Sequence, residues 1–185
     1  MQYKPDKFIN ATLFFAEHTN PKKLGVTKLM KLLFFADFLH YERYGRSILG
    51  DKYFRLPEGP VPSRSFNFFR ETFEKNKKTG LEENIKIIEN IVKDYSIKEI
   101  KPLKKYNSDV FSDSDIEVLS EIAKKFYNDT GTKMASETHE IPFIKEASRI
   151  VPIDYRNVIE GNENKEYVDF LRKMDEQIEN ALQTP

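Results

Sequence analysis

The sequence predicts an α+β fold, a mainly α-helical single domain with a central buried helix and a small antiparallel β element. Three observations lead to this prediction. Several segments repeat apolar residues at helical spacing. One of them, residues 27–44, is apolar on almost every side. Residues 85–103 instead alternate apolar and charged side chains, as β-hairpins do. A chain of 185 residues with 15 Phe and 9 Tyr is enough for one domain with a full core.

Two helices are predicted at the start of the chain. Residues 3–17 form the first, which ends before Asn20-Pro21. Residues 27–44 form the second, and nine of the eleven positions from Leu29 to Leu39 are apolar. We therefore expect other elements to cover this helix on nearly all sides. Gly45 is suited to end it, because glycine accepts the left-handed backbone that often follows a helix.

Residues 47–63 are rich in glycine and proline. Proline fixes φ and disfavours helix in the residue before it, so we expect a short extended run and then a stiff turn at Gly59–Pro62. Ser63 is of the residue type that caps helices, and it predicts a helix to about residue 78 that Gly80 ends.

A β-hairpin is predicted over residues 85–103, turning near residues 93–96, because β-branched residues recur at about period two. A helix over residues 82–92 is the alternative. A helix then begins at Ser112, where Asp115 completes a capping box.

The last third of the chain predicts three more helices. A short one spans about residues 133–138, after the break at Thr130-Gly131. Another starts at Pro142, since proline is favoured in the first helical turn. Residues 163–182 form the last helix, with an apolar stripe on one face.

The charges are unevenly distributed, although the net charge is zero. Residues 1–80 carry 15 basic and 8 acidic side chains, a net charge of +7, and residues 81–185 carry a net charge of −7. Such a split has two functional interpretations: two surfaces of opposite sign, or one half that recognises a partner. The alternative is that two oppositely charged parts of the chain pack together.

Several classes of protein are excluded by residues that the chain lacks. Without Cys there are no disulfides, thiolate zinc sites, iron–sulfur clusters or cysteine nucleophiles. The first twelve residues have no signal-peptide core, and the longest apolar run, Leu32–Ala36, is far short of the about 20 residues that a membrane span needs. We therefore expect a cytoplasmic protein without a membrane partner.

No catalytic or metal-binding set emerges from the motifs, so we expect a protein that is not an enzyme and has no metal or cofactor. The nucleophile motif G-x-S-x-G is absent, and Gly45 and Gly50 do not form a phosphate-binding loop. His40 follows Asp37 at a spacing that allows a pair on one helix face, which we interpret as structural. His139 lies before Pro142, where it can bond the free carbonyls of an ending helix or contact a partner.

The distribution of charge bears on nucleic-acid binding. Residues 112–149 resemble a helix-turn-helix, but the chain from Asp109 onward carries a net charge of −8, which opposes binding to phosphates. The better surface comprises basic residues of the first half: Lys22, Lys23, Lys28, Lys31, Arg43, Arg46, Lys52, Arg55 and Arg64. We expect no nucleic-acid partner, and a DNA-binding transcriptional autoregulator is the alternative function.

Four blocks of sequence resemble the Panacea domain of the SocA-like antitoxin family, whose members are also labelled phage-associated proteins. They are Lys28–Phe38, Tyr44–Tyr53, Gly59-Pro60-Val61 and Ser136–Phe143, the last with Phe143 where the family often has Trp. The resemblance covers about residues 22–147. It implies one Panacea-like domain over residues 1–185, in which residues 150–185 are a C-terminal helical extension.

The resemblance also implies a function and partners. The family's members are antitoxins of bacterial toxin–antitoxin systems that neutralise a cognate toxin by direct protein–protein binding. In the SocA case the antitoxin is also a proteolytic adaptor that delivers the toxin to the Clp protease. Both partners are expectations for this chain.

The glycine- and proline-rich loop is the predicted partner-binding segment, because aromatic residues with Arg are common interface anchors and a rigid loop loses less entropy on binding. The residues predicted to contact the partner are Tyr53, Arg55, Gly59, Pro60, Val61 and His139. In the alternative, the prolines only join a strand to a helix and Tyr53 packs inward.

Overall fold

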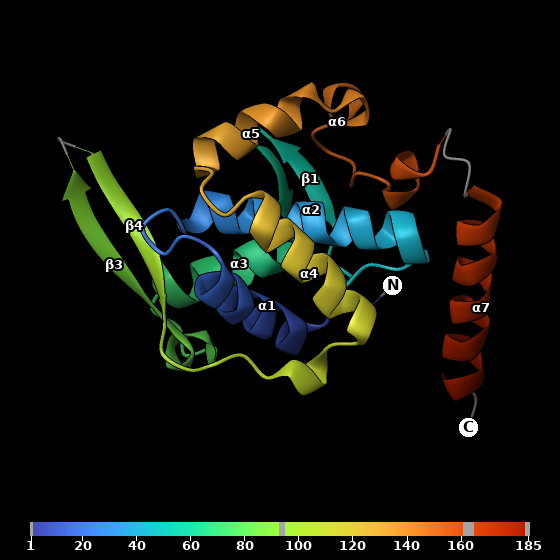
Figure 1. Cartoon of the computed structure of the whole chain (residues 1–185), viewed down its shortest axis with the longest axis horizontal. Coiled ribbons are helices and arrows are strands. Elements are labelled where there is room, and N and C mark those ends of the chain that lie inside the picture. Colours follow the sequence, from blue (N-terminus) through green and yellow to red (C-terminus); the bar gives the residue numbers. More distant parts are fainter. Residues whose placement is uncertain (1, 93–94, 161–164, 184–185) are drawn as a thin grey trace.

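The computed structural model describes residues 2–92, 95–160 and 165–183. Within these residues the chain is mainly helical, with two small antiparallel sheets of two strands each, which confirms the predicted α+β class (Figure 1). The helices are α1 (Pro5–His18), α2 (Val26–Tyr44), α3 (Ser63–Phe73), α4 (Asp113–Lys125), α5 (Gly131–Glu140), α6 (Pro142–Glu146) and α7 (Lys165–Gln183). The strands are β1 (Tyr53–Leu56), β2 (Gly59–Pro62), β3 (Ile85–Val92) and β4 (Tyr95–Pro102), and short 3-10 turns are η1 (Leu81–Glu83), η2 (Ser108–Val110) and η3 (Tyr155–Val158). No helix in this part of the chain is long and apolar enough to cross a membrane.

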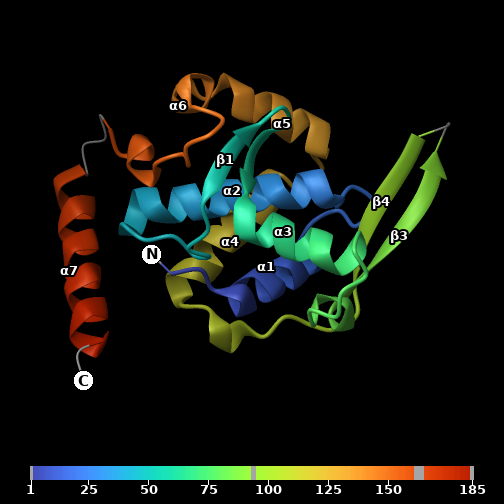
Figure 2. The ribbon, with the colours of Figure 1, turned by 180° about the vertical axis from the view of Figure 1, so that it is seen from behind.

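Helix α2 runs through the middle of the molecule, as its apolar sequence predicts. The other helices surround it: α4 crosses in front of it in Figure 1, and α3 lies in front in the reverse view of Figure 2. Gly45 ends α2 in the left-handed conformation, with φ of +70°, and donates a hydrogen bond to Tyr41 O. A side chain at this glycine would also collide with the backbone of α7 near Val168.

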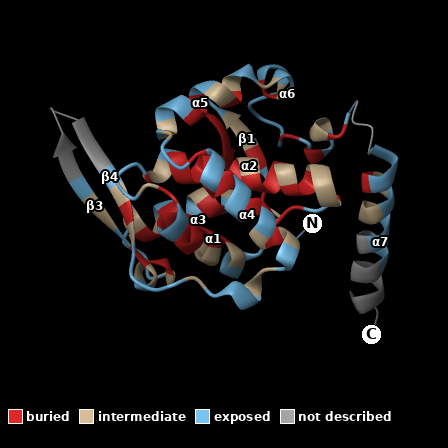
Figure 3. Cartoon of the chain, in the orientation of Figure 1, coloured by how far each residue is buried: buried red, intermediate tan, exposed pale blue. Residues whose placement is uncertain are grey.

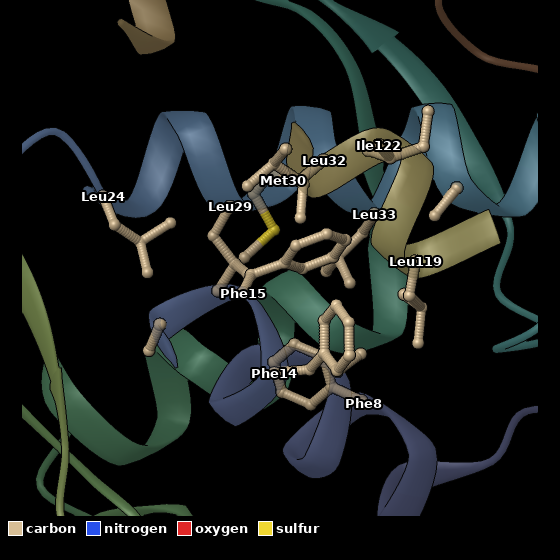
Figure 4. Close-up of a cluster of buried hydrophobic side chains, with 14 of the residues drawn as sticks. Phe8, Phe14, Phe15, Leu24, Leu29, Met30, Leu32, Leu33, Leu119 and Ile122 are labelled. Atoms are coloured by element: carbon tan, nitrogen blue, oxygen red, sulfur yellow. The ribbon is translucent and has the colours of Figure 1, made fainter. Parts of the chain in front are cut away.

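The buried apolar side chains form two clusters along α2. In Figure 3 most of α2 is red, the colour of buried residues. The larger cluster joins α1, α2 and α4 and includes Phe8, Phe15, Leu29, Leu33 and Leu119, which meet in Figure 4. The smaller cluster is mostly aromatic and joins α2 to the C-terminal part of the chain through Phe34, Phe38, Tyr41, Tyr53, Ile144, Ile153, Tyr155, Ile159 and Val168.

The predicted β-hairpin is confirmed. Strands β3 and β4 pair antiparallel from Ile85 opposite Pro102 to Val92 opposite Tyr95, so the alternative helix over residues 82–92 does not form. Residues 93 and 94 of the predicted turn lie outside the described residues. The hairpin and α7 lie at opposite ends of the molecule in both views (Figures 1 and 2).

Helix α3 differs from the prediction at both ends. It ends at Phe73 rather than near residue 78, because residues 74–78 are polar and exposed and offer the helix no apolar side chain to pack. Its N-terminus is not capped by Ser63, which is already its first residue. Helix α5 starts at Gly131, earlier than predicted, because Thr130 caps it by accepting a hydrogen bond from Lys133 N.

The capping box of α4 is confirmed, and it has a second role. Ser112 Oγ accepts a hydrogen bond from Asp115 N, and the Asp115 carboxylate accepts one from Ser112 N at 2.9 Å. The same carboxylate pairs with Lys7 and lies 3.2 Å from Nε2 of His40. The pair of His40 with Asp37 that the spacing allows does not form, because each finds a different partner, and His40 is structural as expected. Its Nδ1 lies 2.6 Å from Arg46 O.

Candidate partner-binding surface

The hairpin β1–β2 contains most of the predicted partner-binding residues, and most of them are buried. Tyr53 pairs with Pro62 and Leu56 with Gly59 across the two strands. Gly59 has φ of +88°, and a Cβ there would lie 2.4 Å from Thr138 Oγ1 of α5. Glycine at this position is therefore required both by the backbone and by the close contact with α5.

The Gly-Pro-Val motif itself packs inward against α2. Lys31 Nζ donates a hydrogen bond to Pro60 O at 2.9 Å, and both residues are buried. Val61 is 8% exposed and belongs to the larger core cluster. The motif therefore joins the hairpin to the central helix, and it presents almost no surface to a partner.

Tyr53 is fully buried and forms part of a hydrogen-bond network around Asp37. Its hydroxyl donates to Asp37 Oδ2 at 3.0 Å, and the hydroxyl of Tyr155 donates to the same oxygen at 3.1 Å. Leu49 N donates to Oδ1 at 2.8 Å. Burial raises the pKa of the Asp37 carboxyl to about 7, although these three hydrogen bonds act in the opposite direction.

A second carboxylate, Asp51, lies just before the hairpin and caps helix α3 from outside the helix. Asp51 Oδ1 accepts a hydrogen bond from Arg64 N at 3.0 Å, and Oδ2 accepts one from Ser65 N at 2.8 Å. These amides are among those that a helix leaves without partners at its N-terminus. Asp51 thus replaces Ser63 in the capping role and ties the loop before β1 to α3.

Arg55 and His139 are the more exposed members of the predicted set. The guanidinium of Arg55 donates to Lys145 O at 2.7 Å and to Ala147 O at 3.3 Å, so it holds the C-terminal end of α6 against the hairpin. His139 lies in the last turn of α5, half-buried, and among the described residues its ring forms no hydrogen bond with the carbonyls at the end of that helix.

An aromatic groove also involves α6, through Phe143. It lies between α2, α4, α6 and η3, has a volume of about 190 Å³, and is lined by Phe35, Phe38, Leu39, Phe143 and Val158, with Glu42 and Lys125 at its edges. Phe38 is buried, and the other four of these apolar residues are half-buried. These five apolar residues define the aromatic groove below.

Ring stacking fixes the geometry of the aromatic groove. Phe38 and Phe143 are stacked at 5.9 Å with an interplanar angle of 11°, and Phe35 stacks on Phe126 at 4.6 Å. Lys125 Nζ lies 5.1 Å from the centre of the Phe126 ring, a cation–π contact at the edge. The groove is a preformed concave surface with aromatic walls and one charge of each sign beside it.

None of the partner-binding residues predicted from the sequence lines the aromatic groove. Its signal is Phe35 and Leu39, which are four residues apart and therefore neighbours on one face of α2. That face is the part of α2 that the other elements leave half-covered. The apolar run alone could not reveal it, because every face of the helix carries apolar side chains.

The basic surface suggested for nucleic acid is smaller than the sequence indicated. Lys28 and Lys31 are each 1% exposed, because their ammonium groups bond to the carbonyls of Tyr127 and Pro60. The helix-turn-helix-like segment also differs from a DNA-binding helix-turn-helix motif, since its third helix, α6, has only five residues.

The sequence of the chain matches the model of one known protein family. The model of the family described as "Antitoxin SocA-like, Panacea domain" matches residues 29–142, which run from the first turn of α2 to the start of α6. No curated protein and no solved structure matches the chain. The matched segment contains all but the first three residues of α2, the β1–β2 hairpin, and helices α4 and α5, and it covers more than half of the chain. The chain therefore belongs to the SocA-like antitoxin family and carries its Panacea domain.

Proposed function

We propose that this protein is the antitoxin of a toxin–antitoxin system and that it neutralises a cognate toxin protein by direct binding, without catalysis, in the bacterial cytoplasm. Membership of the SocA-like antitoxin family carries the proposal. Delivery of the toxin to the Clp protease is a separate prediction, which follows from the family resemblance. It is tested by measuring whether the toxin level falls only when the protease is present.

The aromatic groove is the proposed centre of the toxin contact. Interface energy concentrates in well-packed aromatic pockets near the middle of a contact surface. Phe35, Leu39 and Phe143 offer such a pocket in a fixed shape, so little entropy is lost there on binding. The expected occupant is an apolar side chain of the toxin, flanked by charges that match Lys125 and Glu42.

The predicted loop residues have a supporting part in this proposal. Tyr53, Gly59, Pro60 and Val61 anchor the hairpin to α2 and α5 from inside the fold. Arg55 donates a hydrogen bond to the end of α6, the helix that carries Phe143. Arg55 and His139, which are only half-buried, are the members of the predicted set that can also touch the toxin directly.

Co-expression of the protein with the products of its flanking genes tests the proposal. We expect the protein to restore growth that one of these products arrests, and the two proteins to co-purify in a complex that survives high salt. Growth that stays arrested with every flanking gene, at full expression of this protein, contradicts the antitoxin function.

Variants of the aromatic groove test the contact surface separately. Phe143→Ala and Phe35→Ala should each weaken toxin binding by at least about 2 kcal/mol if they are hot spots. Tyr127→Ala is the matched control, because Tyr127 is an exposed aromatic residue just after α4 and does not line the groove. Equal affinity for all three folded variants would place the toxin contact elsewhere, while growth rescue would still support the antitoxin function.

A further inference from the structure

A second groove lies at the opposite end of α2 from helix α7 and shares no residue with the aromatic groove. It has a volume of about 730 Å³, which is within the range of small-molecule sites. Its walls come from the residues before α2, the first turns of α2 and α5, and the β3–β4 hairpin. We call it the lysine groove, after Lys22, Lys23, Lys28 and Lys98, which line it.

Positive charge predominates in the lysine groove. Four lysines line it, and Glu89 is the one carboxylate among its lining residues. Asp129 lies nearby and faces Lys28, but its carboxylate is also paired with Lys133 at 2.8 Å. Lysine clusters with so few carboxylates attract anions, and the attraction is strengthened where the walls exclude water.

Lys28 is the most informative of the four lysines. Its side chain is 1% exposed, and its ammonium donates one hydrogen bond, to Tyr127 O at 2.9 Å. An ammonium has three donors, and the described residues supply an acceptor for only one of them. Burial lowers the pKa of Lys28 to about 8; the carboxylate of Asp129 opposes this shift, and the positive charge of Lys23 adds to it. A bound anion would satisfy the remaining donors and relieve this repulsion.

Two helix N-termini meet at the same place. Gly131, the first residue of α5, lies against the first turn of α2, where a Cβ would be 2.8 Å from Lys28 N. Neither helix has an acidic residue in its first turn, and Gly25 caps α2 without any side-chain bond. Both positive dipole ends therefore add to the charge of the lysines. Gly131 permits this approach of α5 to α2, and Gly25 permits a close approach of β4, because a Cβ there would lie 3.1 Å from Lys98 O.

We propose that the lysine groove binds the phosphate group of a nucleotide-sized ligand, either a free nucleotide or the backbone of a single-stranded nucleic acid. Lysine is a point charge that suits phosphate without demanding a fixed orientation. Three threonines, Thr27, Thr130 and Thr132, line the same groove and add hydroxyl donors. No aromatic ring lines it, so the site recognises phosphate rather than a base.

Calorimetric titration of the full chain tests the proposal. The probes are pyrophosphate, a nucleoside triphosphate and a single-stranded oligonucleotide of about ten nucleotides, each at low and at physiological salt. Binding of the first two without the third identifies a free nucleotide, and binding of the oligonucleotide alone identifies a nucleic-acid backbone. Either pattern supports the phosphate site.

Charge-reversal variants locate the binding. Lys22→Glu/Lys23→Glu and, on the opposite wall, Lys98→Glu should weaken binding at least about tenfold, since hydrogen bonds to charged groups are individually strong. Lys28→Met should weaken it while keeping the length of the buried side chain. Lys104→Glu/Lys105→Glu is the matched control, because it makes the same charge change at exposed residues outside the groove.

Three results would overturn the proposal. The first is that no probe binds to the wild-type protein at low salt. The second is that the control pair weakens binding as much as Lys22→Glu/Lys23→Glu, which would mean non-specific charge attraction. The third is that a polyglutamate peptide binds as tightly as the phosphate probes, which would make the groove a contact for an acidic protein instead. Circular dichroism of each variant ensures that a loss of binding is not a loss of fold.

Discussion

The hydroxyl of Tyr155 lies 3.1 Å from Asp37 Oδ2, a contact between residues 118 positions apart in the sequence. The same hydroxyl also lies 2.9 Å from Asp51 O. Tyr155 belongs to η3, outside the segment that matches the family, whereas Asp37 belongs to the central helix. The segment that follows the family match is therefore hydrogen-bonded directly to the central helix.

The first prediction concerns this contact. Tyr155→Phe removes a hydrogen bond from a fully buried carboxylate and should lower the free energy of unfolding by about 1–3 kcal/mol. Urea denaturation of the full chain measures the change. Tyr167→Phe is the control, because that side chain is 59% exposed, and it should change stability little. Equal stability of the two variants would show that the extension contributes nothing through Asp37.

The second prediction concerns pH. The pKa of Asp37 is about 7 in the folded protein, against an ordinary value of 3.8. The folded state therefore binds this proton more tightly than the unfolded state, and its contribution to stability is largest at low pH. That contribution is lost as the pH rises from 3.8 to about 7, and it is constant above that range.

The comparison that isolates this carboxyl is between the wild type and Asp37→Asn. Because the histidines and other acids titrate in both proteins, the difference between their stability curves reports Asp37 alone. Between about pH 5 and pH 7 the wild type should lose up to about 1.4 kcal/mol per pH unit relative to the variant. Parallel curves would mean that Asp37 is ionised in the fold.

The elements of this fold could be predicted where a local pattern decides the structure. The apolar run of α2 determines that the helix is buried, and the alternation over residues 85–102 determines the β3–β4 hairpin. The capping box at Ser112 involves two residues only three positions apart. In each case the residues that matter are close together in the chain.

The partners of buried polar groups could not be predicted, because they come from distant parts of the chain. Nothing in the sequence near Asp37 indicates that Tyr155 reaches it, and nothing near Lys31 indicates that its ammonium lies under Pro60. A polar residue in an apolar helix marks a buried hydrogen bond, but it does not name the acceptor or donor.

The candidate site was harder to predict for a different reason. The sequence predicts Tyr53 and the Gly-Pro-Val motif at an interface because aromatic and rigid residues are common there, yet the same residues are common in cores. Composition alone cannot separate the two, and the structure buries Tyr53, Gly59, Pro60 and Val61. The half-covered face of α2 depends on where α4 and α6 lie, which is a tertiary property.

The third prediction separates two candidate caps of α3. Asp51→Ala removes the acceptor for the amides of Arg64 and Ser65 and should cost about 0.5–2 kcal/mol, the usual range for a helix cap. Ser63→Ala is the control, because its hydroxyl contacts only Asp51, at 3.5 Å. Thermal unfolding of both variants gives the comparison. A larger loss of stability for Ser63→Ala than for Asp51→Ala would show that Ser63 is the cap, as the sequence alone predicts.

The last prediction concerns Arg55 as a positioning residue for the aromatic groove. Its guanidinium bonds to Lys145 O and Ala147 O, so Arg55→Ala should loosen the end of α6 and with it the wall formed by Phe143. We expect faster amide hydrogen exchange over residues 142–147 in the free protein and toxin affinity reduced by more than about twofold. Glu58→Ala, an exposed change at the turn of the same hairpin, is the control and should alter neither quantity. Lower affinity with unchanged exchange would assign Arg55 to direct contact with the toxin. If exchange and affinity both stay at the wild-type level, Arg55 has no part in the site, and the groove is held in shape by the stacking of Phe38 on Phe143 alone.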